Sequence, residues 1–550
     1  MPDPRETLAD LHGRVMDRRR FLAWSGALAG TAAYAQLRGD LAVAAPPLPG
    51  YPFTLGVASG DPAPDTVSLW TRLVPEPFAK SGGMPNKPVA VTWQVADDAG
   101  FTQNLRSGTV AAVPELAHSV HADVTGLQPG REYHYRFIAG GVESPTGHTK
   151  TAPAYGSHVD SLKFAFASCQ AWEDGFYSAY RRMVRNEDLD LVIHLGDYIY
   201  EGQVSPDGGR RNVKVSGVLR EETRTLESYR LRHTLYKTDP DLQEAHRRFP
   251  WAVTWDDHEV ENDYAGTTGA YFKPNEGFVN RRAAAYQAYY EHMPLRLSAK
   301  PTTTELRLYR SLRYGDIAKF NVMDTRQYRD DQPCGDGEQF ACPGNETATK
   351  LGAAQLGWLL GEMSGSDARW NVMAQGTMMG QLKHNEEGTY FWQDAWDGYS
   401  GERSRILSAI HQMGVSNPVS IAGDWHSTFV HDLKADYADA TAPVVATEFV
   451  GTSITSNGDG LVYGPYYAPM VPFNDHIKFF DGDRRGYVLC TLDHEVWQTE
   501  LRMVENVASP DAAEYTFASF VVENGQPGAQ INCSPGSNPP PLGRVDCTPV

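Results

Sequence analysis

The chain has 550 residues, a formal net charge of −19 and 41% hydrophobic residues. This length exceeds one ordinary hydrophobic core, so two or more domains are expected, and the composition excludes a disordered or a membrane-embedded chain. The acidic balance argues against nucleic acid as a stable partner, because such a partner requires a basic face.

The first segment, residues 1–44, has the order of an export signal. Three arginines and a Phe-Leu pair (Arg18–Leu22) precede a short apolar run, Ala23–Ala35. This order resembles the twin-arginine signal, and Ala42–Ala44 offers a cleavage site. We therefore expect a twin-arginine signal peptide, recognised by the twin-arginine translocase of a bacterium, and a protein that is secreted, periplasmic or on the cell surface. The alternative is a basic tail followed by an ordinary helix.

Four of the six cysteines form two close pairs. Cys334 and Cys342 lie in a polar loop, and Cys533 and Cys547 lie in a Pro/Gly-rich tail. Both pairs predict local disulfides in an oxidising compartment. Cys490 lies in a strand-like segment, which favours a buried core thiol.

Residues 50–155 read as an all-β domain. Val67–Val74 and Val89–Val95 have strand composition, with turn residues between them. The segment Val124–Phe137 resembles the end-strand pattern of fibronectin type III domains, in which a tyrosine tethers a corner. The first domain is therefore expected to be fibronectin type III/Ig-like.

From residue 160 the pattern changes to strands that alternate with helices, which is typical of an α/β domain. We assign this domain to residues 160–505 and treat residues 506–550 as a C-terminal tail with a disulfide. The strands expected to be buried are Phe164–Ala167, Leu189–Leu195, Trp251–Trp255, Ala318–Met323, Asn371–Ala374 and Val419–Ala422.

Each of these predicted strands runs directly into polar residues. The six clusters are Ser168–Gln170, Gly196–Glu201, Asp256–Glu259, Asp324–Arg326, Gln375–Thr377 and Gly423–His426. One such cluster would be an ordinary turn signal. Because the carboxyl ends of strands in open sheets share one edge, where ligands bind, six clusters together predict a metal site.

The donor types indicate which metals this site would hold. Several carboxylates, amide oxygens and few histidines favour hard cations such as Ca²⁺, Mg²⁺ or Mn²⁺. Cys169 and Tyr200 are anionic donors once deprotonated, which suits Fe³⁺. Taken singly, Cys169 would be interpreted as a buried thiol and Tyr200 as an aromatic ring of the core. Their position beside Asp197 favours a ligand role for both.

Three of these clusters resemble a known group. Gly196–Tyr200, Asp257–Glu259 and Gly423–His426 are similar to the G-D-x-x-Y, G-N-H-[ED] and G-H-x-H blocks of the calcineurin-like metallophosphoesterases. The departures, Cys169 and Asp424 among them, resemble those of PhoD-type alkaline phosphatases. This resemblance implies an α/β metallophosphoesterase sandwich domain, with two mixed sheets flanked by helices, which follows the all-β domain in the chain.

The resemblance also implies one Fe³⁺ and two Ca²⁺ ions as cofactors. Iron would take Cys169, Asp197 and Tyr200, with a further ligand from Asp424 or His426. Asp197 would bridge to one of the calcium ions. The remaining calcium-side ligands implied are Asp257, Asn262 and Gln375.

The implied activity is that of a secreted metal-dependent phosphatase. It would hydrolyse phosphate monoesters, and some diesters, by metal-activated hydroxide attack. His258 is the candidate donor of a proton to the leaving alkoxide, with His426 as its rival. Arg326 is the candidate phosphate contact, against the alternative of a structural salt bridge. The substrate would be a small-molecule phosphoester or a phospholipid, and the protein a monomer.

Other interpretations have weaker support. A cysteine phosphatase requires C-x5-R, but Gly175 stands six residues after Cys169. A phospholipase of the H-x-K-x4-D type requires two motifs, and only His476–Asp483 fits. A phosphodiesterase or phospholipase D of the same fold stays open, to be decided by residues 203–240 and the aromatic segment 385–405. The alternative of another class is a non-catalytic surface-binding protein.

Overall fold

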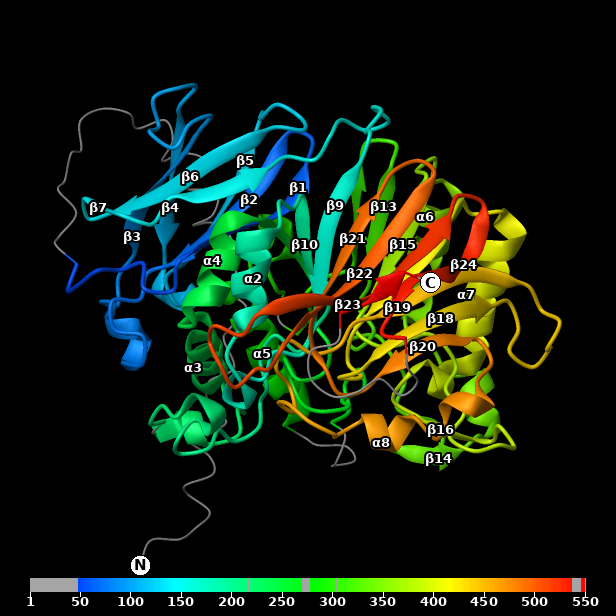
Figure 1. Ribbon diagram of the computed structural model, residues 1–550. Coiled ribbons are helices and arrows are strands. Elements are labelled where there is room, and N and C mark those ends of the chain that lie inside the picture. Colours follow the sequence, from blue (N-terminus) through cyan, green and yellow to red (C-terminus); the bar gives the residue numbers. More distant parts are fainter. Residues whose placement is uncertain (1–47, 216, 270–276, 303, 537–545, 550) are drawn as a thin grey trace, which may run out of the picture. The chain divides into compact units, whose positions relative to one another are not determined.

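The computed structural model describes residues 48–215, 217–269, 277–302, 304–536 and 546–549. The predicted signal peptide, residues 1–44, lies outside these described residues. Among the described residues, no helix is both long and apolar enough to cross a membrane. Two large β-sheets organise this part of the chain (Figure 1).

The larger sheet has 11 strands and mixes parallel and antiparallel pairs. In spatial order they are β25 (Thr548–Pro549), β24 (Gln526–Ser534), β23 (Glu514–Glu523), β22 (Val496–Val504), β21 (Arg485–Leu492), β9 (Leu162–Ala167), β10 (Leu191–His194), β11 (Pro250–Val253), β1 (Val57–Ala63), β2 (Thr66–Arg72) and β5 (Ser119–Thr125).

The second sheet has seven strands and is also mixed. In spatial order they are β12 (Arg310–Tyr314), β13 (Ala318–Val322), β15 (Trp370–Ala374), β17 (Pro418–Ala422), β19 (Val444–Val450), β18 (Thr428–Lys434) and β20 (Ile477–Asp481). A separate two-stranded antiparallel sheet pairs β14 (Glu338–Phe340) with β16 (Tyr390–Trp392).

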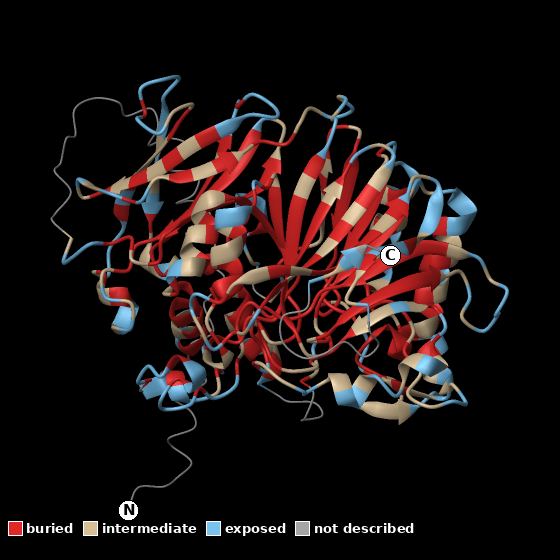
Figure 2. Ribbon diagram, viewed as in Figure 1, coloured by how far each residue is buried: buried red, intermediate tan, exposed pale blue. Residues whose placement is uncertain are grey.

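The two sheets enclose one hydrophobic core, and helices cover their outer faces. On β9, Phe164 and Phe166 belong to the core between the sheets, whereas Ala165 and Ala167 belong to the core beneath the helices. This division follows from the strand period of two, which sends successive side chains to opposite faces. Figure 2 shows the resulting continuous buried interior.

Each helical layer has its own apolar core. The larger sheet is covered by α2 (Ser178–Asn186), α3 (Leu226–Lys237), α4 (Pro240–Arg248) and α5 (Phe278–His292). The seven-stranded sheet is covered by α6 (Gly352–Ser364) and α7 (Ser400–Met413). The short helix α8 (Gly464–Tyr467) lies in a loop. The predicted arrangement of two mixed sheets flanked by helices is therefore confirmed.

The six predicted strands are present, with ends within two residues of the predicted ones. They fall into two sets of three parallel neighbours, β9-β10-β11 in one sheet and β13-β15-β17 in the other. Their carboxyl ends therefore come from two facing sheets rather than from one edge of a single sheet. An isolated bridge between Ser168 and Ser453 links the two sheets just beyond β9 and β19.

The region after residue 48 is built of strands, with two short 3-10 helices at Lys80–Gly83 and Pro114–Leu116, as expected for an all-β region. Besides β1, β2 and β5 of the larger sheet, a separate five-stranded sheet is formed by β4 (Arg106–Ala112), β3 (Val89–Ala96), β6 (Glu132–Ala139), β7 (Val142–Glu143) and β8 (Gly147–Lys150). A hydrophobic core lies between this five-stranded sheet and β1, β2 and β5. Because β1 pairs in parallel with β11, this region extends the larger sheet without a break.

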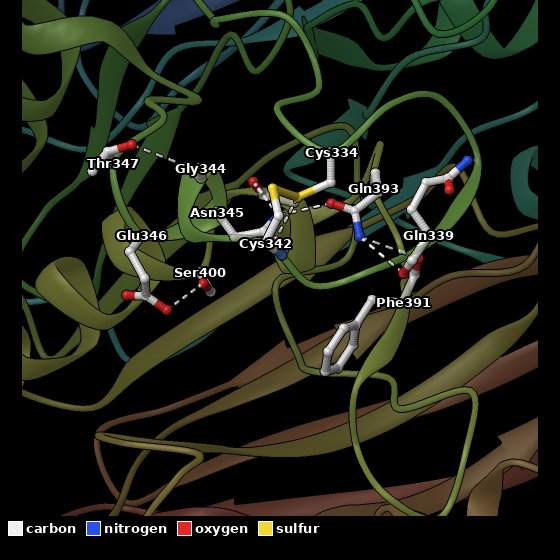
Figure 3. Close-up of a disulfide and its surroundings, with 11 residues drawn as sticks. Cys334, Gln339, Cys342, Gly344, Asn345, Glu346, Thr347, Phe391, Gln393 and Ser400 are labelled. Carbon is white, nitrogen blue, oxygen red and sulfur yellow. Dashed lines mark hydrogen bonds between the residues drawn. A yellow bond between two sulfur atoms is a disulfide. The ribbon is translucent and has the colours of Figure 1, made fainter.

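Both predicted disulfides are present. Cys334 is bonded to Cys342 and Cys533 to Cys547, while Cys490 is a free, fully buried thiol in β21. Figure 3 shows the first disulfide beside Asn345, whose amide bonds to the Gln393 side chain at 2.7 Å.

Candidate metal centre

A cavity of about 680 Å³ opens where the carboxyl ends of the two parallel strand sets meet. Seven of the predicted site residues line it: Asp197, Tyr200, Asp257, His258, Asn262, Asp424 and His426. Cys169 lies beneath them, with 1% of its surface exposed. Residues that are far apart in the sequence are thus brought to one point by the ends of short buried strands.

Several of these residues share an unusual backbone conformation. Cys169, Asp197, Asp424 and His426 have φ angles of 58°, 56°, 70° and 49°. L-residues adopt this left-handed region at a cost of about 1–2 kcal/mol each. Such strain persists only where the surrounding structure over-determines it, and it concentrates at functional sites.

One glycine makes this convergence sterically feasible. Gly196, between β10 and Asp197, has a φ of 116°, and a Cβ atom there would lie 2.5 Å from the amide nitrogen of Asp256. The G-D pair therefore allows the ends of β10 and β11 to approach closely, which brings Asp197 beside Asp257.

The first group of possible metal ligands consists of Cys169, Asp197 and His426, whose ligand atoms lie within 4.8 Å of one another. The Tyr200 hydroxyl joins this group, because it donates to Asp197 Oδ2 at 2.9 Å and lies 2.9 Å from His426 Nε2. Ser456 donates to the same phenol oxygen at 2.8 Å. This set of thiol, carboxylate, phenol and imidazole suits iron.

Two further groups are made mainly of oxygen donors. Asp197, Asp257 and His258 form one, and Asp256, Asp257 and Asp424 form the other. Asp197 thus belongs both to the cysteine-containing group and to a carboxylate group, so its carboxylate would be shared if both groups held a metal ion. Asp424 lies with the carboxylates, whereas His426 lies with Cys169.

Two buried carboxylate oxygens lack a hydrogen-bond donor, and a bound cation would take its place. Among the described residues, Asp197 Oδ1 and Asp257 Oδ1 are buried and accept no hydrogen bond, and Asp257 Oδ1 has only a 3.6 Å ion-pair contact with Arg326. A buried polar atom without a partner costs about 1–3 kcal/mol. Burial and the nearby Asp256 charge raise the pKa of Asp424 well above its usual value. The residues present therefore fit bound metal ions, since cations would satisfy the oxygens and offset the crowded negative charge.

Burial and the negative charge of Asp197 also change the pKa values of the Cys169 thiol and the Tyr200 phenol. Burial, followed by the charge of Asp197, raises the pKa of the Cys169 thiol well above its ordinary value. Burial and the same carboxylate raise the pKa of Tyr200. Coordination to a cation reverses this trend, because a coordinating thiol is deprotonated outright.

His258 is held by a carboxylate that the sequence reasoning did not assign to the site. Its Nδ1 lies 2.7 Å from Glu201 Oε2, and its ring lies 4.2 Å from that of Tyr200. Glu201 is fixed in turn by the backbone amide of Asn262 at 2.8 Å. Burial alone would lower the pKa of His258, but Glu201, Asp257 and Asp197 raise it well above its usual value. A signal was available, since Glu201 directly follows the G-D-x-x-Y block.

His426 differs from His258 in having both ring nitrogens directed at site residues. Its Nδ1 contacts the Asn457 side-chain oxygen, and its Nε2 faces Tyr200 and, at 3.9 Å, Asp197 Oδ2. Asn457 and Ser456 come from the segment after β19, which the sequence analysis did not single out. Both histidines belong to a group of possible metal ligands, but only His258 is also held by a carboxylate outside these groups, Glu201, which favours His258 as the proton donor and His426 as the metal ligand.

Gln375 and Arg326 are not among the cavity-lining residues in the part of the chain that the structure describes. The Gln375 amide bonds to Ser420 Oγ at 3.0 Å and to Trp396 Nε1 at 2.7 Å, so both of its ends are used in the core. Arg326 is 0% exposed. Neither side chain reaches the position that its predicted role requires.

Arg326 instead forms a buried ion-pair network. Its guanidinium lies 2.5 Å from Asp256 Oδ1 and 2.7 Å from Asp394 Oδ2, and Arg329 shares the Asp394 carboxylate at 2.5 Å. Arg326 therefore takes the structural salt-bridge role. The network anchors the segment that carries Asp257.

We expect Arg326→Met to lower the free energy of unfolding by about 3–5 kcal/mol, because it leaves the buried Asp256 carboxylate without its ion-pair partner, whereas Asp394 keeps Arg329. Chemical denaturation measures the change. Arg405→Met is the matched control, since Arg405 is exposed and 3.8 Å from its nearest acid. Unchanged stability together with a large rise in KM would instead support a phosphate contact.

Aromatic side chains form one wall of the cavity. They are Trp392, Trp425, Tyr463, Tyr466 and Tyr467. Trp392 comes from the predicted aromatic segment 385–405, whereas Phe391, Trp396 and Tyr399 of that segment are buried in packing. The three tyrosines come from the region of α8, which the sequence analysis did not identify. From residues 203–240, Gln203, Val204, Arg232 and Tyr236 reach the cavity.

Comparison with known proteins identifies relatives over most of the chain. Residues 164–501 match the family described as PhoD-like phosphatase, and residues 40–153 match the N-terminal domain of PhoD-like phosphatase. A protein of Bacillus subtilis (strain 168), alkaline phosphatase D, is 46% identical over 525 residues, which cover 94% of this chain and 89% of the relative. A solved structure titled "Structure of PhoD" superposes with a TM-score of 0.84 at 45% identity, covering 89% of this chain and 94% of that one.

Proposed function

The chain belongs to the PhoD-like phosphatase family and is a phosphoric ester hydrolase, and we propose that it is an exported, metal-dependent phosphatase that favours phosphate monoesters. The observation that carries this proposal is the convergence of unsatisfied buried carboxylates with Cys169, Tyr200 and His258 at one cavity. Family membership also favours an enzyme over a non-catalytic surface-binding protein.

The proposed cofactors are one Fe³⁺ and two Ca²⁺ ions. Cys169, Asp197, Tyr200 and His426 would hold iron, since their donor atoms form one group. The oxygen donors Asp257, Asp424 and Asn262 would hold calcium together with Asp197. Gln375 is left out, because its amide is already bonded at both ends. When bound, such cations neutralise phosphate charge and lower the pKa of a coordinated water.

The chain's own residues supply orientation and a proton. Glu201 accepts a hydrogen bond from Nδ1 of His258, which directs that ring and leaves Nε2 to carry the proton that goes to the leaving oxygen. Tyr200 packs against the same ring and limits its rotation. The aromatic wall excludes water from one side of the substrate.

We further propose that the chain is exported by the twin-arginine translocase and acts as a monomer. Two disulfides support an oxidising destination. The N-terminal strands are proposed to be fibronectin type III/Ig-like, because their sheets have the order β1-β2-β5 and β4-β3-β6-β8. In support, the Tyr133 hydroxyl accepts a hydrogen bond from the backbone amide of Gln128, as a tyrosine corner does.

Substrate class can be tested by comparing two aryl esters. A site with several cations should favour the dianionic monoester over the monoanionic diester, so kcat/KM should be higher for an aryl monophosphate than for a bis-aryl phosphate. Chelator-treated enzyme serves as the control and should lose both activities. A tenfold or greater preference for the diester, about 1.4 kcal/mol, would contradict the monoester proposal.

The alternative within the same fold is a phosphodiesterase or phospholipase D. The aromatic wall favours it, because five aromatic side chains offer a surface for a second ester group. Trp392→Ala should then weaken diester hydrolysis more than monoester hydrolysis. Equal losses of diester and monoester hydrolysis would indicate that the aromatic side chains contribute to packing and not to the choice of substrate.

A further inference from the structure

A second cluster of metal-ligand side chains lies at the opposite ends of the strands. His158 precedes β9, Asp316 lies in the turn between β12 and β13, and His494 lies in the turn between β21 and β22. Asp316 and His158 thus lie at the amino ends of β13 and β9 (Figure 1), whereas the candidate metal centre follows the carboxyl ends of these strands and their parallel neighbours. The six residues of β9 alone span roughly 20 Å, so the two clusters are separate.

The three side chains converge on one carboxylate. His158 Nδ1 lies 3.2 Å from Asp316 Oδ2, and His494 Nε2 lies 3.3 Å from Asp316 Oδ1. The two imidazole rings are stacked, with centroids 4.7 Å apart and planes inclined by 19°. Ligand atoms bound at about 2.0–2.1 Å around a tetrahedral zinc ion are about 3.3 Å apart, and the three candidate ligand atoms lie within 4.8 Å of one another, so small side-chain rotations would bring them to one ion.

Oxygen atoms surround the two imidazoles. His158 faces Asp316 with Nδ1 and Asp160 with Nε2, at 3.2 and 3.4 Å. Nε2 of His494 faces the Val159 carbonyl oxygen at 3.2 Å and Asp316 Oδ1 at 3.3 Å. Asp160 and Asp316 thus bring two carboxylates to the cluster, whose negative charge a shared metal ion would offset.

The surroundings resemble the outer contacts of a metal site. A metal-bound histidine generally donates its other N–H to a carboxylate or a carbonyl, and Asp160 is placed to accept from Nε2 of His158. The Val159 amide donates to Asp316 Oδ1 at 3.1 Å, which fixes the carboxylate. The side chains of Asp316 and His494 are 30% and 21% exposed, and that of His158 is 66% exposed, so an ion could enter from solvent.

We propose that His158, Asp316 and His494 bind one divalent transition-metal ion of the zinc class. Two imidazole nitrogens and one carboxylate suit Zn²⁺, Ni²⁺ or Cu²⁺ and not the oxygen-seeking Ca²⁺. With three protein ligands, a fourth position is left for water. The ion would link the segment before β9 to two turns, one from each large sheet. It would stabilise the fold and take no part in the hydrolysis reaction.

The test uses the full-length protein with its catalytic metals in place. Zinc binding is measured by equilibrium dialysis and elemental analysis for the wild type, His158→Gln and His494→Gln. His411→Gln, an exposed histidine on α7, is the matched control. The wild type and the control should bind one more zinc equivalent than the two site variants, whose affinity for that equivalent falls at least tenfold. Aryl phosphate hydrolysis before zinc addition should be the same in all four.

Cu²⁺ electron paramagnetic resonance gives a second readout that does not depend on stability. The wild-type spectrum should show nitrogen couplings from two imidazoles, and each site variant should show one. Zinc should raise the melting temperature of the wild type and not of His158→Gln, whose exposed side chain can be replaced without disturbing packing. Equal zinc stoichiometry and affinity in all four proteins would overturn the proposal and leave His158, Asp316 and His494 as ion pairs only.

Discussion

Cys169→Ala should remove the proposed iron and reduce phosphatase activity by about 10³-fold, because loss of a metal ion forfeits several kcal/mol of transition-state stabilisation. Cys169 is 1% exposed, and its ligand atom lies within 4.8 Å of those of Asp197 and His426. The wild type should carry a thiolate- or phenolate-to-iron charge-transfer band in the visible, and the variant should be colourless. Elemental analysis and kinetics on an aryl monophosphate measure the two losses.

The chain offers a matched control for this experiment. Cys490 is the other free cysteine and is equally buried, but it lies in β21 within the core between the sheets. Cys490→Ala should keep the colour, the iron and the activity, and lose only packing energy. Cooperative unfolding of Cys169→Ala would show that its inactivity is not misfolding. A colourless, iron-free wild type with full activity would contradict the assignment of iron to Cys169.

Much of the fold could be predicted from the sequence because local signals agreed with one another. The six buried strands were short apolar runs ending in polar residues, and each is present. Their division between two sheets could not be predicted, since strand pairing depends on contacts between distant segments. The strands β23 and β24 lie in the predicted tail of residues 506–550. The alternation of polar and apolar residues from Glu514 to Phe517 was the sequence signal for β23.

The site was predictable in its residue types but not in its side-chain directions. Strand ends brought Asp197, Asp257 and Asp424 to the cavity, because backbone topology alone determines that placement. Gln375 and Arg326 also follow strands, yet their side chains turn toward Ser420 and Asp256. Such rotamers are set by partners that are remote in the sequence, so spacing does not reveal them.

His258→Ala should slow the hydrolysis of an alkyl phosphate by about 10²–10⁴-fold and that of a nitrophenyl phosphate far less. An alkoxide is a poor leaving group that requires a proton, whereas nitrophenolate leaves without one. His258 lines the cavity, and its Nδ1 is held by Glu201 at 2.7 Å, so Nε2 can serve as the donor. Steady-state kinetics on both esters, with metal content measured in parallel, test this role.

Two further variants distinguish the role of His258 from that of His426. Glu201→Gln retains a hydrogen-bonding partner for His258 but removes the charge that supports its protonated form, so it should show the same leaving-group dependence with a smaller amplitude. His426→Ala should instead slow both substrates by the same factor and lower the metal content, because its Nε2 lies against Tyr200 and Asp197. If His426→Ala shows the leaving-group dependence while His258→Ala loses metal, the roles of the two histidines are reversed. Their contrasting partners, one carboxylate outside the ligand groups for His258 and two ligand candidates for His426, favour His258 as the proton donor and His426 as the metal ligand.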